Sequence, residues 1–197
     1  MNRSALALFV GVSLPLLGCG SSAAESEPVT FQEYVASFTF DYNPASALAD
    51  LSVRSSVVAQ AQLLDVEDGA IFGTTPEDPA ANHSLNLIFE TDDGERYYVE
   101  LPRPAYMSVE QLRAAMPLDS ASVIYLQPNN DPRDANFFNV REGPTWFFTT
   151  PQGWILADPE RGNITPLEGT DSLGFEAPDG GDADLRAWLV NPKTPSA

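Results

Sequence analysis

The sequence predicts a mainly β domain with minor α content, built as a small barrel of five to six strands. One helix is inserted between strands, and a short helix lies near the C-terminus. Three observations predict this class: a long alternating run over residues 53–66, a hairpin over residues 85–101, and a single capped helix over residues 108–116. A first strand of that length has to bend or coil, as in a small barrel.

The segment before the long strand is predicted to hold two short helical pieces. Apolar and aromatic side chains recur at helical spacing between Phe31 and Phe38, although the aromatic residues leave a strand open. Asn43-Pro44 is predicted to cap a turn of helix through Leu48 to Leu51.

The long strand is predicted from strict alternation. One alternating face is expected to carry Val53, Ser55, Val57, Ala59, Ala61 and Leu63. Residues 70–73 are predicted to form a short partner strand, and residues 74–83 a polar loop.

The hairpin is predicted from Asp93-Gly94, which lies between two apolar and aromatic runs, residues 85–90 and 96–101. Asp-Gly favours the tight turns that join antiparallel strands. Residues 108–116 then form the predicted helix, because Ser108 is a good N-cap, Gln111 occupies the capping-box position and Pro117 ends the run.

The C-terminal half is predicted to complete the sheet. Residues 122–127 form a strand and residues 128–144 a long polar loop. Residues 145–150 and 153–157 are expected to pair with each other through Pro151-Gln152. An edge strand limited by Pro166 follows over residues 162–167, and a last helix over Asp182 to Leu189.

This order, with a helix between the third and fourth strands, resembles the oligonucleotide/oligosaccharide-binding (OB) barrel. The resemblance is topological, covers residues 53–167 and includes no sequence motif. The chain is also similar to small secreted β-barrel proteins of unknown function from bacteria. A shared fold does not define a function, so no site residue follows from either likeness.

The N-terminus has the pattern of a processed export signal. A basic start, Met1-Asn2-Arg3, precedes an apolar run over residues 5–17 that is too short to span a bilayer. It ends in Leu16-Leu17-Gly18-Cys19, which resembles the lipobox of bacterial lipoproteins. The resemblance implies cleavage after Gly18, a diacylglycerol thioether on Cys19 and acylation of the new amino terminus. The alternative is an ordinary signal peptide in which Cys19 is incidental.

These features predict the domain organisation and the location. We expect a signal peptide over residues 1–18, a flexible tether over 19–29, one domain over 30–191 and a tail over 192–197. The lipid would hold the protein in the cell envelope. The outer membrane is expected if the cell has two, because no Asp follows Cys19 to resemble an inner-membrane retention signal. The expected partners are the membrane and an envelope protein.

Composition excludes several classes of protein. The formal net charge of −18 argues against a nucleic-acid partner, since phosphate contacts need clustered Lys and Arg. One Cys excludes a disulfide scaffold and a cysteine zinc site. Residues 65–100 concentrate the charge, with ten acidic side chains and one basic residue, Arg96. Anionic headgroups would repel such a surface.

The candidates for chemistry are few. His83 is the only His, so a nucleophilic triad would have to use it, with Ser84 as one partner. No Gly-x-Ser-x-Gly turn is present, which favours a surface or junction role for His83. A catalytic carboxylate pair stays open, because such a pair is defined by its separation in space.

Calcium is the metal considered for this sequence, because it needs only oxygen ligands. Asp179, Asp182 and Asp184 are the candidate ligands, although Asp182 serves equally well as an N-cap. Three further acidic or oxygen-rich loops, residues 65–69, 92–95 and 129–131, are considered, and turn chemistry explains the first two. Otherwise we expect no cofactor.

Aromatic residues offer a last candidate, a platform for a sugar or another ligand. It would use Trp146, Trp154, Trp188, Phe147 and Phe148, although core packing is the simpler interpretation. Together these observations favour a non-enzymatic envelope lipoprotein that binds a partner or serves a structural role. The alternative is a calcium-dependent or carboxylate-based enzyme or ligand-binding domain.

Overall fold

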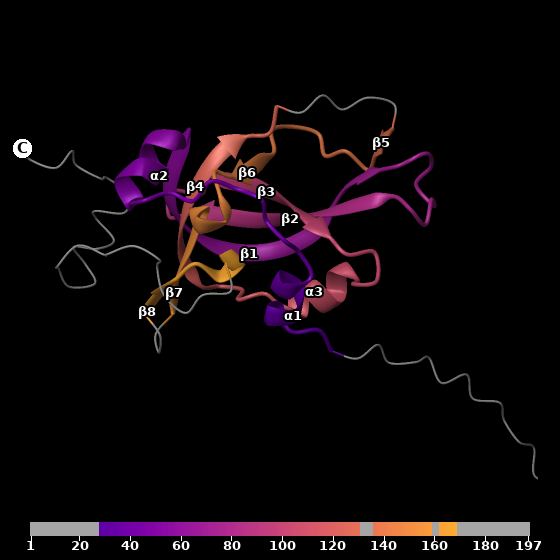
Figure 1. The fold of residues 1–197 in the computed structure, drawn as a ribbon, viewed down its shortest axis with the longest axis horizontal. Coiled ribbons are helices and arrows are strands. Elements are labelled where there is room, and N and C mark those ends of the chain that lie inside the picture. The colour runs from indigo at the N-terminus through magenta and orange to yellow at the C-terminus, as the bar shows by residue number, and fades with distance from the viewer. Residues whose placement is uncertain (1–27, 131–135, 159–161, 169–197) are drawn as a thin grey trace, which may run out of the picture.

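The structure, a computed structural model, describes residues 28–130, 136–158 and 162–168 (Figure 1). These ranges confirm the mainly β class, with short helices beside one mixed sheet. The helices are α1 (Phe31–Ala36), α2 (Leu48–Arg54) and α3 (Val109–Ala115), with single 3-10 turns η1 (Pro151–Gly153) and η2 (Pro166–Glu168). The strands are β1 (Val57–Phe72), β2 (Asn82–Thr91), β3 (Arg96–Arg103), β4 (Ala121–Pro128), β5 (Phe137–Phe138), β6 (Trp146–Phe148), β7 (Trp154–Asp158) and β8 (Gly162–Ile164).

The sheet follows the order β5-β1-β2-β3-β6-β4-β7-β8, and β4 also pairs with β1. β1 makes this return possible because it is shared: its first part pairs with β4 and its later part with β2, both antiparallel. β3 and β6 pair in parallel. The pairings therefore partly ring the core, and α1 and α3 lie together at one end of it (Figure 1).

β1 bends, as its length predicts. Its register with β2 shifts between Leu63 and Asp65 and again between Asp68 and Ile71. Such irregularities bend a strand and increase its twist. Of the residues predicted to share one face of this strand, Ala59, Ala61 and Leu63 are buried.

The predicted bounds of this strand were wrong at both ends. Val53 belongs to α2 and its side chain is 86% exposed, so the alternation that included it was coincidental. Residues 70–73 do not form a separate partner strand, because β1 continues through Ile71 and Phe72. These two residues pair with β5, which lies within the polar loop predicted over residues 128–144.

The two N-terminal helices differ in how they begin. α1 confirms the helical option, and Thr30 and Glu33 form a capping box at its start. The predicted Asn43-Pro44 cap of α2 was wrong, because Ala47 is the N-cap and makes no side-chain cap bond. The backbone carbonyl of Asn43 instead accepts a 2.8 Å hydrogen bond from Arg54 at the other end of α2.

The hairpin and the central helix are confirmed. β2 and β3 pair from Glu90 with Arg96 to His83 with Arg103, and Gly94 in the turn has a positive φ of 86°. Ser108 and Gln111 form the capping box of α3.

The predicted pairing of residues 145–150 with 153–157 was wrong. β6 and β7 follow each other along one edge of β4, where Phe148 pairs with Leu126 and Trp154 with Ile124. η1 forms the excursion between them, and an added Cβ at Gly153 would lie 2.8 Å from the Tyr125 carbonyl oxygen. Pairing with β4 therefore replaces the hairpin. β8 is the predicted edge strand, and the predicted helix over residues 182–189 lies outside the described residues.

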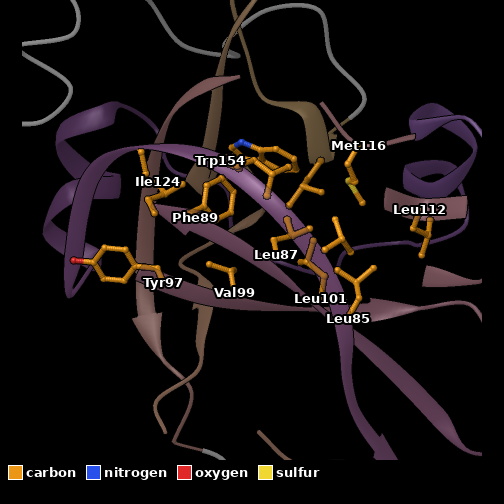
Figure 2. Close-up of a cluster of buried hydrophobic side chains, with 14 of the residues drawn as sticks. Leu85, Leu87, Phe89, Tyr97, Val99, Leu101, Leu112, Met116, Ile124 and Trp154 are labelled. Carbon is orange, nitrogen blue, oxygen red and sulfur yellow. The ribbon is translucent and has the colours of Figure 1, made fainter. Parts of the chain in front are cut away.

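The core lies between the sheet and the helices (Figure 2). Trp154 is fully buried there, stacks on Phe148 with ring centroids 5.8 Å apart and donates a 3.0 Å hydrogen bond to the Ser122 hydroxyl. Burial of such a ring contributes strongly to stability when its N–H has a partner, as here. In the described part of the chain, no helix has the length and apolar character needed to cross a membrane.

Candidate functional site

An apolar pocket of about 360 Å³ is lined by the late part of β1 together with residues of β2, β3, β5 and β6, and we call it the aromatic pocket. Pockets that bind small ligands are concave and mostly apolar, with a few polar groups, and this one has that character. Its walls include side chains from widely separated parts of the sequence: Phe40, Ala70, Phe72, Asn82, His83, Ser84, Glu100, Leu101, Pro102, Phe137, Phe147, Phe148, Thr150, Pro151 and Leu167.

The second irregularity of β1 shapes one wall of the aromatic pocket. At Gly69 the backbone passes so close to β2 that an added Cβ would lie 2.8 Å from the Ser84 carbonyl carbon. This approach requires glycine. Beyond it, Phe72 packs against Phe137 of β5 with ring centroids 4.9 Å apart, and both rings line the pocket.

Few polar groups line the aromatic pocket. Thr150 is 5% exposed, and its buried Oγ1 has no hydrogen-bond partner. The Glu100 carboxylate is also buried and accepts a 2.9 Å hydrogen bond from the Asn129 amide. The Ser84 hydroxyl donates to the Ala70 carbonyl oxygen at 3.0 Å. Thr150 is therefore a hydroxyl that a bound molecule could satisfy.

His83, which lines the pocket, is linked through Arg103 to Asp68. Its Nδ1 lies 3.1 Å from Nη2 of Arg103, which also forms a 3.2 Å ion pair with Asp68. Because a guanidinium only donates, His83 Nδ1 must accept. The structure therefore does not join His83 to Ser84 as a nucleophilic pair: Nδ1 bonds to Arg103, and the Ser84 hydroxyl hydrogen bonds to Ala70.

A larger hollow, about 740 Å³, adjoins the aromatic pocket and shares Phe40, Pro151 and Leu167 with it. It lies between α1 and η2. Tyr42 donates a short hydrogen bond to Glu168 at its rim, and burial together with this carboxylate raises the pKa of Tyr42. The hollow therefore extends the apolar surface towards the last described residues.

The acidic segments have different outcomes. Residues 65–69 were predicted as a turn, which was wrong: they lie within β1, where Asp65 contacts Arg113 at 2.5 Å and Asp68 pairs with Arg103. Residues 92–95 form the hairpin turn, as turn chemistry predicts. The calcium candidates Asp179, Asp182 and Asp184 lie outside the described residues, as does Cys19.

The predicted aromatic platform is divided by the structure. Trp154 is a core residue, and Phe148 stacks on it while also lining the aromatic pocket. Phe147 lines the pocket, whereas Trp146 packs edge-on against Tyr97. Trp188 lies outside the described residues. Within the described ranges, no three His, Cys, Asp or Glu side chains gather in a way that could hold a metal ion.

Sequence reasoning missed Thr150 and Glu100, as well as Phe40, Phe72 and Phe137. One signal was available: Phe137-Phe138 is an aromatic pair within an otherwise polar loop, and such a pair needs apolar cover. Thr150 and Glu100 gave no comparable signal, because their burial depends on distant segments.

Comparison with known proteins gives no relative of this chain: no protein-family model, no curated protein and no solved structure matches it.

Proposed function

We propose that the chain is a bacterial envelope lipoprotein whose domain is a non-enzymatic binding module. The observation that carries the proposal is the aromatic pocket. A pocket of about 360 Å³ with mainly apolar walls, which include five Phe side chains, fits a substituted aromatic or branched apolar group, since a 150 Å³ apolar cavity already accepts benzene. The ligand would place such a group against Phe147 and direct a polar atom towards Thr150.

We also propose that the domain is an OB-like barrel. The pairings from β1 through β2, β3, β6 and β4 back to β1 support this assignment, as do the parallel pairing of β3 with β6 and the position of α3 between β3 and β4. The pocket then lies at an end of the ring, where the excursion η1 and the short strand β5 leave apolar side chains uncovered.

The anchor in this proposal is the lipid on Cys19, supported by the lipobox pattern of residues 16–19. Two or more acyl chains hold a protein on a membrane far more durably than one. The protein would lie in the cell envelope, in the outer membrane of a cell with two membranes. The negative charge of the domain keeps it away from anionic headgroups.

A titration tests the binding proposal. The chain from Gly20 to Ala197 keeps every described residue and needs no detergent that could fill the pocket. We expect 4-phenylbutan-2-one to shift the backbone amide resonances of Ser84 and Thr150. Phe147→Ala should weaken binding about tenfold, because one aromatic contact is lost. Tyr106→Ala is the matched control, since this exposed ring lines neither hollow. Resonance shifts spread over the surface, or absent, would overturn the proposal.

A second experiment tests the anchor. We expect the native chain to fractionate with membranes and to carry diacylglycerol by mass spectrometry, and Cys19→Ser to carry none. Mature protein that begins after another residue, without lipid, would refute the lipoprotein assignment. Cross-linking in intact envelopes followed by purification tests for a protein partner, and repeated recovery of the protein alone would count against one.

A further inference from the structure

A third, polar hollow of about 190 Å³ lies beside the aromatic pocket, and we call it the polar pocket. The two share Ala70 and Glu100, so one molecule could occupy both. Its other lining residues come from β2 and from the segment that follows β4: Asn86, Asn129, Val140, Arg141, Gly143, Pro144 and Thr145.

The floor of the polar pocket is a cross-strand pair on the outward face of the β2–β3 hairpin. Asn86 of β2 lies directly opposite Glu100 of β3, so the two side chains are close neighbours. Exposed positions are usual on such a face, but Asn86 is 2% exposed and Glu100 9%. The segment after β4 covers them: Arg141 stacks 3.2 Å from the centre of the Tyr98 ring, and Asn139 donates to the Gly69 carbonyl oxygen at 2.8 Å.

Two residues that line this pocket each have a buried polar atom without a hydrogen-bond partner: Oδ1 of Asn86 and Nε of Arg141. The Asn86 amide nitrogen faces the Asp68 carbonyl oxygen, 3.4 Å away, which leaves Oδ1 as the atom without a partner. An unsatisfied buried acceptor is costly. The pocket therefore presents one acceptor and one donor that a bound group could satisfy together.

We propose that the polar pocket binds an amide group of the ligand whose apolar part occupies the aromatic pocket. The amide N–H donates to Oδ1 of Asn86, and the amide carbonyl oxygen accepts from Nε of Arg141. A neutral group with one donor beside one acceptor matches both atoms, whereas a carboxylate would lie against Glu100 and an ammonium against Arg141. The ligand class is an aromatic or branched amide, such as a small acylated amine or an apolar peptide segment. This inference rests on the proposed binding function.

The test compares two probes that differ in one group. N-benzylacetamide has an N–H where 4-phenylbutan-2-one has a methylene, and both have the carbonyl oxygen. We expect the ratio of their Kd values to change about tenfold between the native chain and Asn86→Leu, because the N–H loses its acceptor. Affinity for the ketone should stay nearly unchanged. Gln62→Leu, an exposed amide-to-leucine change on β1, should leave the ratio unaltered.

Each result has a distinct meaning. If the ketone binds and Asn86→Leu leaves the ratio unchanged, the amide inference is wrong while the aromatic pocket stands, and solvent satisfies Asn86. If neither probe binds, the binding function fails and this inference fails with it. If Asn86→Leu does not fold, Asn86→Ala, which also removes the acceptor oxygen, replaces it, and an unchanged ratio in that variant also overturns the inference. A matched series of acetylated apolar dipeptides then separates a peptide ligand from a small amide.

Discussion

Both faces of the β2–β3 hairpin contain buried side chains, but these side chains are buried in different ways. On the inner face Leu85, Leu87 and Val99 are fully buried in the apolar core (Figure 2). On the outer face Asn86 and Glu100 are covered by a single loop segment and lie beside hollows. A buried apolar side chain needs only close packing by neighbours of complementary shape, whereas a buried polar group also needs a hydrogen-bond partner. One hairpin thus separates a face that packs in the core from the face that carries the proposed ligand site.

The largest expected effect is on the inner face. Leu87→Ala should lower the free energy of unfolding by about 2–5 kcal/mol, because it removes buried methyl groups and leaves a cavity. Urea unfolding followed by tryptophan fluorescence measures the change. Ile88→Ala, the next residue on the partly exposed face, is the control and should cost less than half as much. Equal losses would show that the two faces are packed alike.

The next effect has the opposite sign. Asn86→Leu should leave the ligand-free protein about 1 kcal/mol more stable, because it removes a buried acceptor that has no partner. The weak contact to the Asp68 carbonyl oxygen limits the gain. Thermal unfolding of this variant beside Gln62→Leu provides the comparison. A clear loss of stability would mean that Asn86 supports the fold as the inner face does.

A smaller effect is expected at the loop that covers the outer face. Arg141→Ala removes the cation–π contact with Tyr98 and should cost about 0.5–1 kcal/mol. Hydrogen exchange should quicken over residues 139–145, while the amides of Leu87 and Val99 keep their protection. Arg54→Ala on α2 is the control. Faster exchange of the Leu87 and Val99 amides as well would mean that residues 139–145 and the core open together.

The smallest effect concerns the ion pair of Asp65 with Arg113, which lies outside both pockets. Burial raises the pKa of Asp65, but the Val66 N–H and Arg113 outweigh it and hold the pKa below its usual value. A lowered folded-state pKa contributes stability at neutral pH that is lost as pH falls through about 4 and below. The carboxylate is 47% exposed, so the contribution is less than about 1 kcal/mol.

Asp65→Asn therefore should be slightly less stable than the native chain at pH 7 and equal to it in acid. Urea unfolding across that pH range checks the sign. A difference that grows in acid would contradict the assignment.

Local signals explain which parts of the fold were predictable. Ser108 with Gln111 and Asp93 with Gly94 act within a few residues, so α3 and the hairpin could be predicted. The strand that pairs with β6 and β7 could not be predicted. The edge of β4 competes with a local hairpin between these two segments, and both pair with β4 instead.

The candidate site was hidden for a similar reason. Asn86 occupies an alternating strand position that normally faces water, and only the distant segment after β4 buries it. Nothing near Asn86 in the sequence indicates that cover. His83 and Ser84, the residues with the most recognisable chemistry, line the pocket, where Nδ1 of His83 is hydrogen-bonded to Arg103 and the Ser84 hydroxyl to the Ala70 carbonyl oxygen.

The double pairing of β1 has a consequence for how the molecule assembles. β2 follows β1 directly in the sequence, whereas β4 comes much later. The ring therefore closes only when Val57 at the start of β1 pairs with the distant Leu126 of β4. Closing long loops makes such topologies fold in milliseconds to seconds, slowly for a small domain. The β2–β3 hairpin can form early, but the start of β1 stays unpaired until β4 arrives.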